Sequence, residues 1–350
     1  MEFSGDNTLV AVGTSESYIR IWSLENKPLT SAIDPPDYHP SSSRRLIGHS
    51  GPVYALSFSP SIALPESTTS NTNGTTNTTA TPAGTPRYLL SSSADSTIRL
   101  WDLSSYTNLV VYKSHSSPVW DVRFSPHGHY FVSSSADRTA RLWSTAHTSP
   151  HRLFVGHDAS VDTVAWHPNS AYVFTAAGAP DRSVRMWDVQ RGSAVRMFTG
   201  HMGNITALAA SPNGKFVASA DDRGEVLLWD LAAGRLVKRM RGHGRGGVWS
   251  LDWSVESSVL VSAGADGTVR VWDVAPSSPG AGDGKVIGEG GAGAKIDAGA
   301  ANALSGKKTK GKDVVVSPDQ ISAFPTKKSP VYKVRFTQMN LVVAGGAYLP

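Results

Sequence analysis

A tryptophan recurs along this chain at a nearly constant interval of 42 to 44 residues. The five members of the series are Trp101, Trp143, Trp187, Trp229 and Trp272. Each ends a phrase such as "DSTIRLWD" or "DGTVRVWD", in which apolar residues alternate with polar ones as in a half-buried β-strand. A period of about 40–45 residues is typical of the four-stranded blade of a β-propeller. The series therefore predicts an all-β chain of repeated blades.

A histidine marks the other end of each repeat: His49, His115, His157, His201 and His243. Each precedes a second alternating phrase, such as "PVWDVRFSP". The last apolar residue of that phrase stands 19 residues before the tryptophan in three repeats, and the same 19 residues separate Phe3 from Trp22. A further copy, "PVYKVRF", lies near the other end of the chain. Five complete and two partial repeats predict seven blades, of which the first and last are incomplete.

The repeats divide the chain into blade pieces of about 1–24, 44–103, 109–145, 152–189, 194–231, 236–274 and 320–350. Two long insertions interrupt them. Residues 61–86 are rich in Ser, Thr and Asn, and residues 275–319 are rich in Gly, Ala and Lys. Neither composition supplies the apolar surface that a packed core needs. We expect 61–86 to be a disordered insertion and 275–319 to be a linker.

The composition excludes several classes of chemistry. The chain has no cysteine, and therefore no disulfide, thiolate metal site or cysteine nucleophile. Its first residues lack the basic and apolar regions of a secretion signal, and no apolar run approaches the roughly 20 residues of a membrane span. We expect an intracellular protein without membrane contact.

The recurring His, Asp and Trp predict a structural clasp, in which an imidazole, a carboxylate and an indole N–H satisfy one another's hydrogen bonds inside each blade. A hydroxyl on the second strand, as at Ser91 and Ser133, would complete it. A catalytic His-Ser-Asp triad is the alternative, but repetition at the blade period favours a stabilising element. The clasp residues are His49, Asp95, Trp101, His115, Asp137, Trp143, His157, Asp181, Trp187, His243, Asp266 and Trp272.

Three blades depart from this pattern. Arg223 stands where the aspartate should be in the blade of Trp229, although Asp222 is close enough to replace it. The first blade has Glu16 at that position, and the last has Lys327 in place of the histidine. We expect these blades to lack the full clasp.

No other pattern predicts catalysis, a cofactor or a metal. The phrase "GEGGAG" follows no strand and opens no helix, so it is not a nucleotide-binding loop. His127, His129, His147 and His151 fit solvated turns better than a metal site. Lys307, Lys308, Lys310 and Lys312 form a basic run that is either simply solvated, a nuclear import signal or a contact to the DNA backbone. Nothing in the chain indicates base-specific contacts.

The repeats resemble the WD40 family, with "GH" at Gly48, Gly156, Gly200 and Gly242 and "WD" at Trp101, Trp187, Trp229 and Trp272. Within it, the phrases "SPVWDVRFSPHGHYFVSSSADRTARLW" and "FVGHDASVDTVAWHPNSAYVFTA" resemble the WD-repeat subunits of the transcription factor TFIID, whose fungal relatives also serve SAGA. This resemblance implies a non-enzymatic nuclear scaffold, free of cofactors, that docks on histone-fold subunits. The helical N-terminal half of those subunits has no counterpart here, so we expect either a fragment of a longer protein or a truncated gene model.

A substrate receptor of a ubiquitin ligase, or a module of another nuclear complex, is the alternative function. Many such receptors carry an arginine two residues after the Trp-Asp pair. The four pairs of this chain have Ser104, Gln190, Ala232 and Ala275 at that position. The absence of an arginine at these four positions favours the transcription scaffold over the ubiquitin-ligase receptor.

Overall fold

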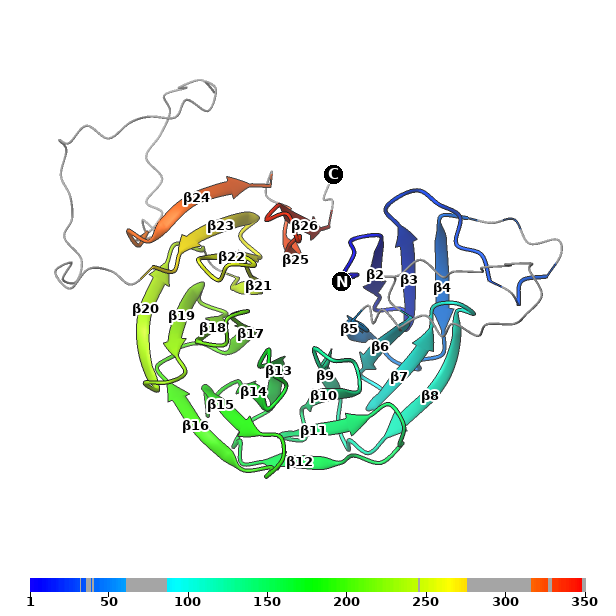
Figure 1. The fold of residues 1–350 in the computed structure, drawn as a ribbon, viewed down its shortest axis with the longest axis horizontal. Helices are drawn as coiled ribbons and strands as arrows, with labels where there is room; N and C mark the ends of the chain where they lie inside the picture. Colours follow the sequence, from blue (N-terminus) through cyan, green and yellow to red (C-terminus); the bar gives the residue numbers. More distant parts are fainter. Residues whose placement is uncertain are drawn as a thin grey trace, which may run out of the picture.

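The computed structural model describes residues 1–31, 33–35, 39, 41–60, 87–244, 246–275, 316–326 and 329–347. Within these residues the regular elements are β-strands, grouped in seven antiparallel sheets. Figure 1 shows the sheets following one another around a central axis, with one strand of each sheet nearest the axis. The predicted seven-bladed propeller is confirmed.

The strands of the first four sheets follow in chain order. The first contains β1 (Glu2–Phe3), β2 (Leu9–Gly13), β3 (Tyr18–Ser23) and β4 (Ser43–Ile47). The second contains β5 (Val53–Phe58), β6 (Tyr88–Ser93), β7 (Thr97–Asp102) and β8 (Thr107–Lys113). The third contains β9 (Val119–Phe124), β10 (Tyr130–Ser135), β11 (Thr139–Ser144) and β12 (Arg152–Val155). The fourth contains β13 (Val161–Trp166), β14 (Tyr172–Ala177), β15 (Ser183–Asp188) and β16 (Ala194–Thr199).

The remaining three sheets continue this order. The fifth contains β17 (Ile205–Ala210), β18 (Phe216–Asp221), β19 (Glu225–Asp230) and β20 (Arg235–Arg241). The sixth contains β21 (Val248–Trp253), β22 (Val259–Gly264), β23 (Thr268–Asp273) and β24 (Gln320–Pro325). The seventh has two strands, β25 (Val331–Phe336) and β26 (Val342–Gly346).

The sheets are offset from the sequence repeats by one strand. The piece 44–103, for example, includes nearly all of β4, yet β4 pairs with β3 of the first sheet, with Leu46 opposite Ile19. The same holds along the chain, so each of the first six sheets takes its outermost strand from the start of the following repeat. Neighbouring repeats are therefore joined by a β-ladder as well as by the chain.

Apolar side chains of neighbouring sheets fill the space between them. Trp143 of the third sheet stacks on Phe131 with ring centroids 5.9 Å apart and planes 6° apart. The same cluster includes Leu90 and Ile98 of the second sheet, and all four side chains are buried. Burial of such large apolar surfaces is the main favourable term in folding. The repeating tryptophans therefore mark the core between blades.

Six of the seven innermost strands contain a β-bulge at their second residue. The pairing of β9 with β10 skips Trp120, and the pairing of β13 with β14 skips Asp162. The other four skipped residues are Tyr54, Thr206, Trp249 and Tyr332. A bulge bends the strand and redirects the extra side chain. All six of these side chains line the cavity along the axis.

The last sheet lies beside the first. Lys333 of β25 forms an ion pair with Glu2 at 2.8 Å, and Nη1 of Arg335 donates to the carbonyl oxygens of Phe3 and Ser4 at 2.6 and 3.0 Å. Within the described residues no β-ladder joins these two sheets. Side-chain contacts hold this junction.

The predicted insertion at 61–86 and residues 276–315 of the predicted linker lie outside the described residues. Residues 316–319, which the sequence placed in the linker, contact the fifth sheet. The N–H of Ser317 donates to the carbonyl of Arg241 at 2.8 Å, and Nζ of Lys238 donates to Asp319 at 2.8 Å. These polar contacts position the chain for β24.

Candidate functional site

The third sheet shows how its clasp residues are arranged. The indole N–H of Trp143 donates to Oγ of Ser133 at 2.9 Å, and this oxygen lies 2.8 Å from Nε2 of His115. Nδ1 of His115 lies 2.8 Å from the carboxylate of Asp137. Asp137 also accepts hydrogen bonds from the N–H and hydroxyl of Thr139, at 3.0 and 2.6 Å. One continuous hydrogen-bonded chain thus links β10, β11 and the two adjoining turns.

The order of donors in this chain determines the tautomer of His115. Trp143 can only donate and an ionised Asp137 can only accept, so the hydroxyl of Ser133 donates to Nε2 and Nδ1–H donates to the carboxylate. Burial lowers the pKa of His115 even though Asp137 favours the charged form. Burial opposes ionisation of Asp137, but hydrogen bonds from His115 and Thr139 outweigh it and hold the pKa below its usual range. The clasp therefore pairs a neutral imidazole with a carboxylate.

Three further sheets contain the same chain of contacts. The imidazole and carboxylate are 2.8, 2.6 and 3.0 Å apart in the pairs His49–Asp95, His157–Asp181 and His243–Asp266. The hydroxyls of Ser91, Thr175 and Ser262 join these histidines to the indoles of Trp101, Trp187 and Trp272. The four chains include all twelve residues named for the clasp from the sequence.

The fifth sheet corrects one expectation. Its clasp is complete: Ser219 contacts His201 at 2.6 Å and accepts the indole N–H of Trp229 at 2.8 Å. The carboxylate comes from Asp221, 3.1 Å from Nδ1 of His201, and not from Asp222. Asp222 instead accepts the N–H and side-chain amide of Asn204. The sequence comparison failed here because Asp221 reaches the histidine from the last position of β18, two residues earlier than the usual turn position.

The two end blades differ from the others as far as they are described. Glu16 of the first blade is exposed, and the ring of Trp22 lies under the guanidinium of Arg20 at 5.2 Å. Lys327, which replaces the histidine of the last blade, lies outside the described residues.

The clasp hydroxyls are poorly placed for nucleophilic catalysis. Ser133 is fully buried, and its oxygen already lies between Trp143 and His115. A serine nucleophile needs a substrate carbonyl within reach of its oxygen. The geometry therefore supports a stabilising role for the clasp.

The remaining candidates from the sequence are scattered. Four of these candidates are exposed: His127, His129, His147 and His151. Among the four, only His147 and His151 contact each other, with ring centroids 5.7 Å apart. In the described part of the chain no three His, Cys, Asp or Glu side chains could hold a metal, and no helix could span a membrane. Lys307, Lys308, Lys310 and Lys312 lie outside the described residues.

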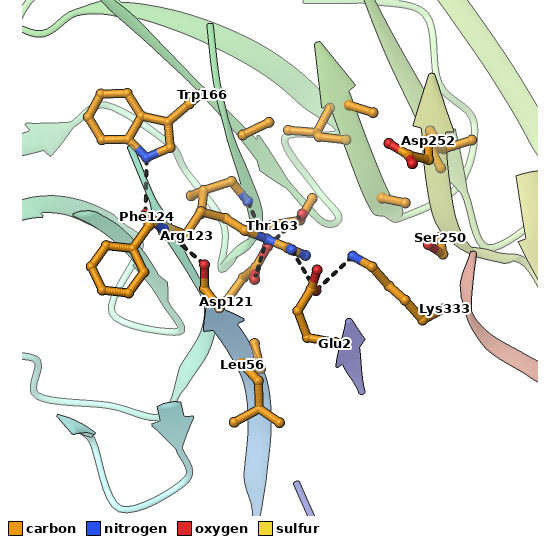
Figure 2. Close-up of a pocket in the computed structure, with 18 of the residues that line it drawn as sticks. Glu2, Leu56, Asp121, Arg123, Phe124, Thr163, Trp166, Ser250, Asp252 and Lys333 are labelled. Atoms are coloured by element: carbon orange, nitrogen blue, oxygen red, sulfur yellow. Dashed lines mark hydrogen bonds and ion pairs between the residues drawn. The ribbon is translucent and has the colours of Figure 1, made fainter. Parts of the chain in front are cut away.

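A cavity of about 550 Å³ lies along the axis, lined by the innermost strands. Figure 2 shows charged side chains from opposite sides of the ring meeting in it. The carboxylate of Glu2 lies 3.0 Å from Nη1 of Arg123 and 2.8 Å from Nζ of Lys333. Asp121 contacts Nε of Arg123 at 3.2 Å and accepts the hydroxyl of Thr163 at 3.0 Å. These contacts link β1, β9, β13 and β25.

Burial and neighbouring charges have opposite effects on the pKa values of these groups. Burial opposes ionisation of Glu2, but Lys333 and Arg123 outweigh it and lower the pKa of Glu2 to about 2. Burial lowers the pKa of Lys333, partly offset by Glu2. Burial raises the pKa of Asp252, although the N–H of Phe336 donates to it at 2.6 Å. Sequence reasoning missed this network, and charged residues within apolar innermost strands were the available signal.

The bulged residues form two aromatic pairs at the cavity. The rings of Tyr54 and Trp120 lie 4.7 Å apart, and those of Trp249 and Tyr332 are stacked at 5.2 Å with planes 7° apart. Trp249, Tyr332 and Tyr54 are exposed by 37%, 47% and 42%. This arrangement was also missed, because bulges leave no mark in the alternating pattern.

Comparison with known proteins identifies the repeats. The family model "WD domain, G-beta repeat" matches residues 78–102, 106–144, 148–188, 192–230 and 234–273. The "SAGA complex/transcription factor TFIID complex subunit Taf5" of Schizosaccharomyces pombe is 42% identical over 115 residues, 32% of this chain and 14% of that protein. "Transcription initiation factor TFIID subunit 5" of Encephalitozoon cuniculi is 36% identical over 139 residues, 36% of this chain and 21% of that protein.

A human relative has a different name. The "TAF5-like RNA polymerase II p300/CBP-associated factor-associated factor 65 kDa subunit 5L" of Homo sapiens is 41% identical over 130 residues, 32% of this chain and 18% of that protein. The aligned segments thus span less than a quarter of each of these relatives. With its matched repeats covering more than half of its length, the chain belongs to the WD40 family, and within that family it is similar to subunit 5 of TFIID.

Proposed function

We propose that this chain is a non-enzymatic scaffold that binds other subunits of a transcription initiation complex of the TFIID or SAGA type. The similarity to TFIID subunit 5 from several organisms carries this proposal. The clasps support it, because a ring with rigid blades presents its loops in fixed positions, as a binding platform requires. The burial of every clasp hydroxyl supports a non-enzymatic role.

The partners proposed are protein subunits with histone folds, and the place of action is the nucleus. Both follow from the resemblance to the TFIID subunits. The basic run at Lys307, Lys308, Lys310 and Lys312 is the proposed import signal. Nucleic acid is proposed to contribute no specific contact.

Affinity purification of the tagged full chain from nuclear extract tests the function, with co-purifying proteins identified by mass spectrometry. We expect TFIID or SAGA subunits to be enriched, and chemical cross-links to join the propeller to histone-fold subunits. A tagged propeller from an unrelated WD40 protein is the control. Enrichment of ubiquitin-ligase subunits without transcription factors would refute the proposal and favour the alternative function.

A further inference from the structure

The bulged residues of three neighbouring blades form one connected cluster at the end of the axial cavity. Trp120 contacts Tyr54 of the preceding blade through its ring. Its indole N–H donates to Oγ of Ser160 at 2.9 Å, and this hydroxyl donates to the carboxylate of Asp162 at 2.7 Å. A serine hydroxyl can accept one bond and donate another, so both contacts hold together. The cluster therefore places two aromatic rings and a carboxylate side by side.

The carboxylate of Asp162 lacks a counter-ion. Among the described residues it forms no ion pair, and the Ser160 hydroxyl is its one hydrogen-bond donor. Two cations of the cavity lining are already engaged: Arg123 contacts Glu2 and Asp121, and Lys333 contacts Glu2. Burial raises the pKa of Asp162, which means that its charge is poorly solvated. A cation that binds from solvent would offset the free-energy cost of burying this charge.

The rings beside this carboxylate also favour a cation. Tyr54 is 42% exposed, so a ligand can reach it from solvent. The face of a tyrosine or tryptophan ring attracts a cation, and a planar guanidinium can stack on it while bonding to a carboxylate. The second aromatic pair, Trp249 and Tyr332, has no such carboxylate at the adjacent bulge, where Thr206 stands. The pair Trp249–Tyr332 therefore serves as an internal control for the pair Tyr54–Trp120.

We propose that Tyr54, Trp120 and Asp162 bind an arginine side chain presented by a segment of a partner protein at the mouth of the axial cavity. The guanidinium stacks on the aromatic pair and forms an ion pair with Asp162. This proposal rests on the proposed function as a protein-binding scaffold, and it names the chemistry by which one face of the ring selects its partner.

The test uses the full chain labelled with 5-fluorotryptophan, whose ten fluorine signals report separately on the ten tryptophans. Trp120→Phe and Trp249→Phe assign two of them. The probe is N-acetyl-arginine methylamide, and its citrulline analogue, which is nearly isosteric but neutral, is the control ligand. We expect the arginine probe to shift the Trp120 signal in a saturable manner and to leave the Trp249 signal in place. The citrulline probe should bind at least about tenfold more weakly, because it has no charge to pair.

Two matched variants separate the site from general charge effects. Asp162→Asn should weaken arginine binding about tenfold, whereas Asp158→Asn, which removes an exposed carboxylate from the loop before β13, should leave it unchanged. Thermal unfolding of both variants checks that they fold. Equal binding of the two probes, or equal effects of the two substitutions, would overturn the proposal.

The two proposals can fail separately. The fluorine measurement needs no other subunit, whereas purification of transcription subunits does not require the arginine site. If Asp162→Asn weakens probe binding about tenfold but the chain purifies with no transcription subunit, the site stands and the proposed function falls. If the probe does not bind while TFIID subunits co-purify, the function stands and the arginine site falls.

Discussion

The carboxylate of Glu2 in the first sheet lies 2.8 Å from the ammonium of Lys333 in the last sheet. Both side chains are largely buried, and Arg123 of the third sheet shares the same carboxylate. Ion pairs are weak at the surface, but removal of one partner is costly where the other remains buried. The junction between the first and last sheets therefore depends on the charge of Glu2.

The first prediction concerns acid stability. The pKa of Glu2 is lowered to about 2 in the folded protein, below its unfolded value near 4.5. The pair therefore stabilises the fold fully above about pH 5, and its contribution is lost as the pH falls towards 2. We expect Glu2→Gln to lower the free energy of unfolding by about 1–3 kcal/mol at pH 7 and by much less at pH 2.5. Urea unfolding at both pH values measures this.

Glu25→Gln is the control for this prediction. Glu25 pairs with Lys27 at 2.5 Å, but both side chains are exposed. Exposed pairs contribute about 0–1 kcal/mol, so this variant should differ little from the parent chain at either pH. An equal loss of stability in both variants would show that the axial pair has no special role.

The second prediction compares two adjacent serines. Ser133 and Ser134 are both fully buried, yet Ser133 joins Trp143 to His115, whereas Oγ of Ser134 has no partner in the described part of the chain. Ser133→Ala should cost about 1–3 kcal/mol because it strands two buried polar groups. Ser134→Ala should be neutral or slightly stabilising, because it removes an unsatisfied hydroxyl. Similar melting temperatures for the two variants would contradict the clasp as a stabilising unit.

The third prediction separates Asp221 from Asp222. Asp221→Ala removes the carboxylate that accepts from buried His201, and Asp137→Ala does the same to His115 in the third sheet. Each should cost about 1–3 kcal/mol. Asp222→Ala should cost clearly less, since it breaks only contacts to Asn204 near the surface. The ranking is tested by calorimetry, and it is wrong if Asp222→Ala is as damaging as Asp221→Ala.

The fourth prediction addresses nuclear entry. Replacement of Lys307, Lys308, Lys310 and Lys312 by alanine removes four positive charges in a run of six residues. If this run is the import signal, a fluorescent fusion of the variant should move from the nucleus to the cytoplasm. The control replaces four surface arginines or lysines on other loops. Unchanged nuclear fluorescence of the variant would exclude the run as the signal.

The sequence allowed the architecture to be predicted because each blade repeats the same phrase. Trp143 and its equivalents mark the core between sheets. The regular spacing of the repeats in the sequence becomes a regular succession of sheets around the axis. Asp221 was missed because a hydrogen bond depends on where the carboxylate lies and not on its place in the repeat, and the last position of β18 reaches His201 instead of the usual turn position. The Glu2–Lys333 pair and the bulged residue Trp120 could not be predicted, because one is formed by closing the ring and the other by a break in strand pairing.

The offset between repeats and sheets has a consequence for how such a chain can change in length. If one repeat were deleted from the start of β12 to the end of β15, β16 would follow β11 and could pair where β12 does now. The third sheet would keep four strands. Recombination between equivalent loops can therefore add or remove a repeat while each remaining four-stranded blade keeps its four strands, and only the circumference of the ring has to adapt.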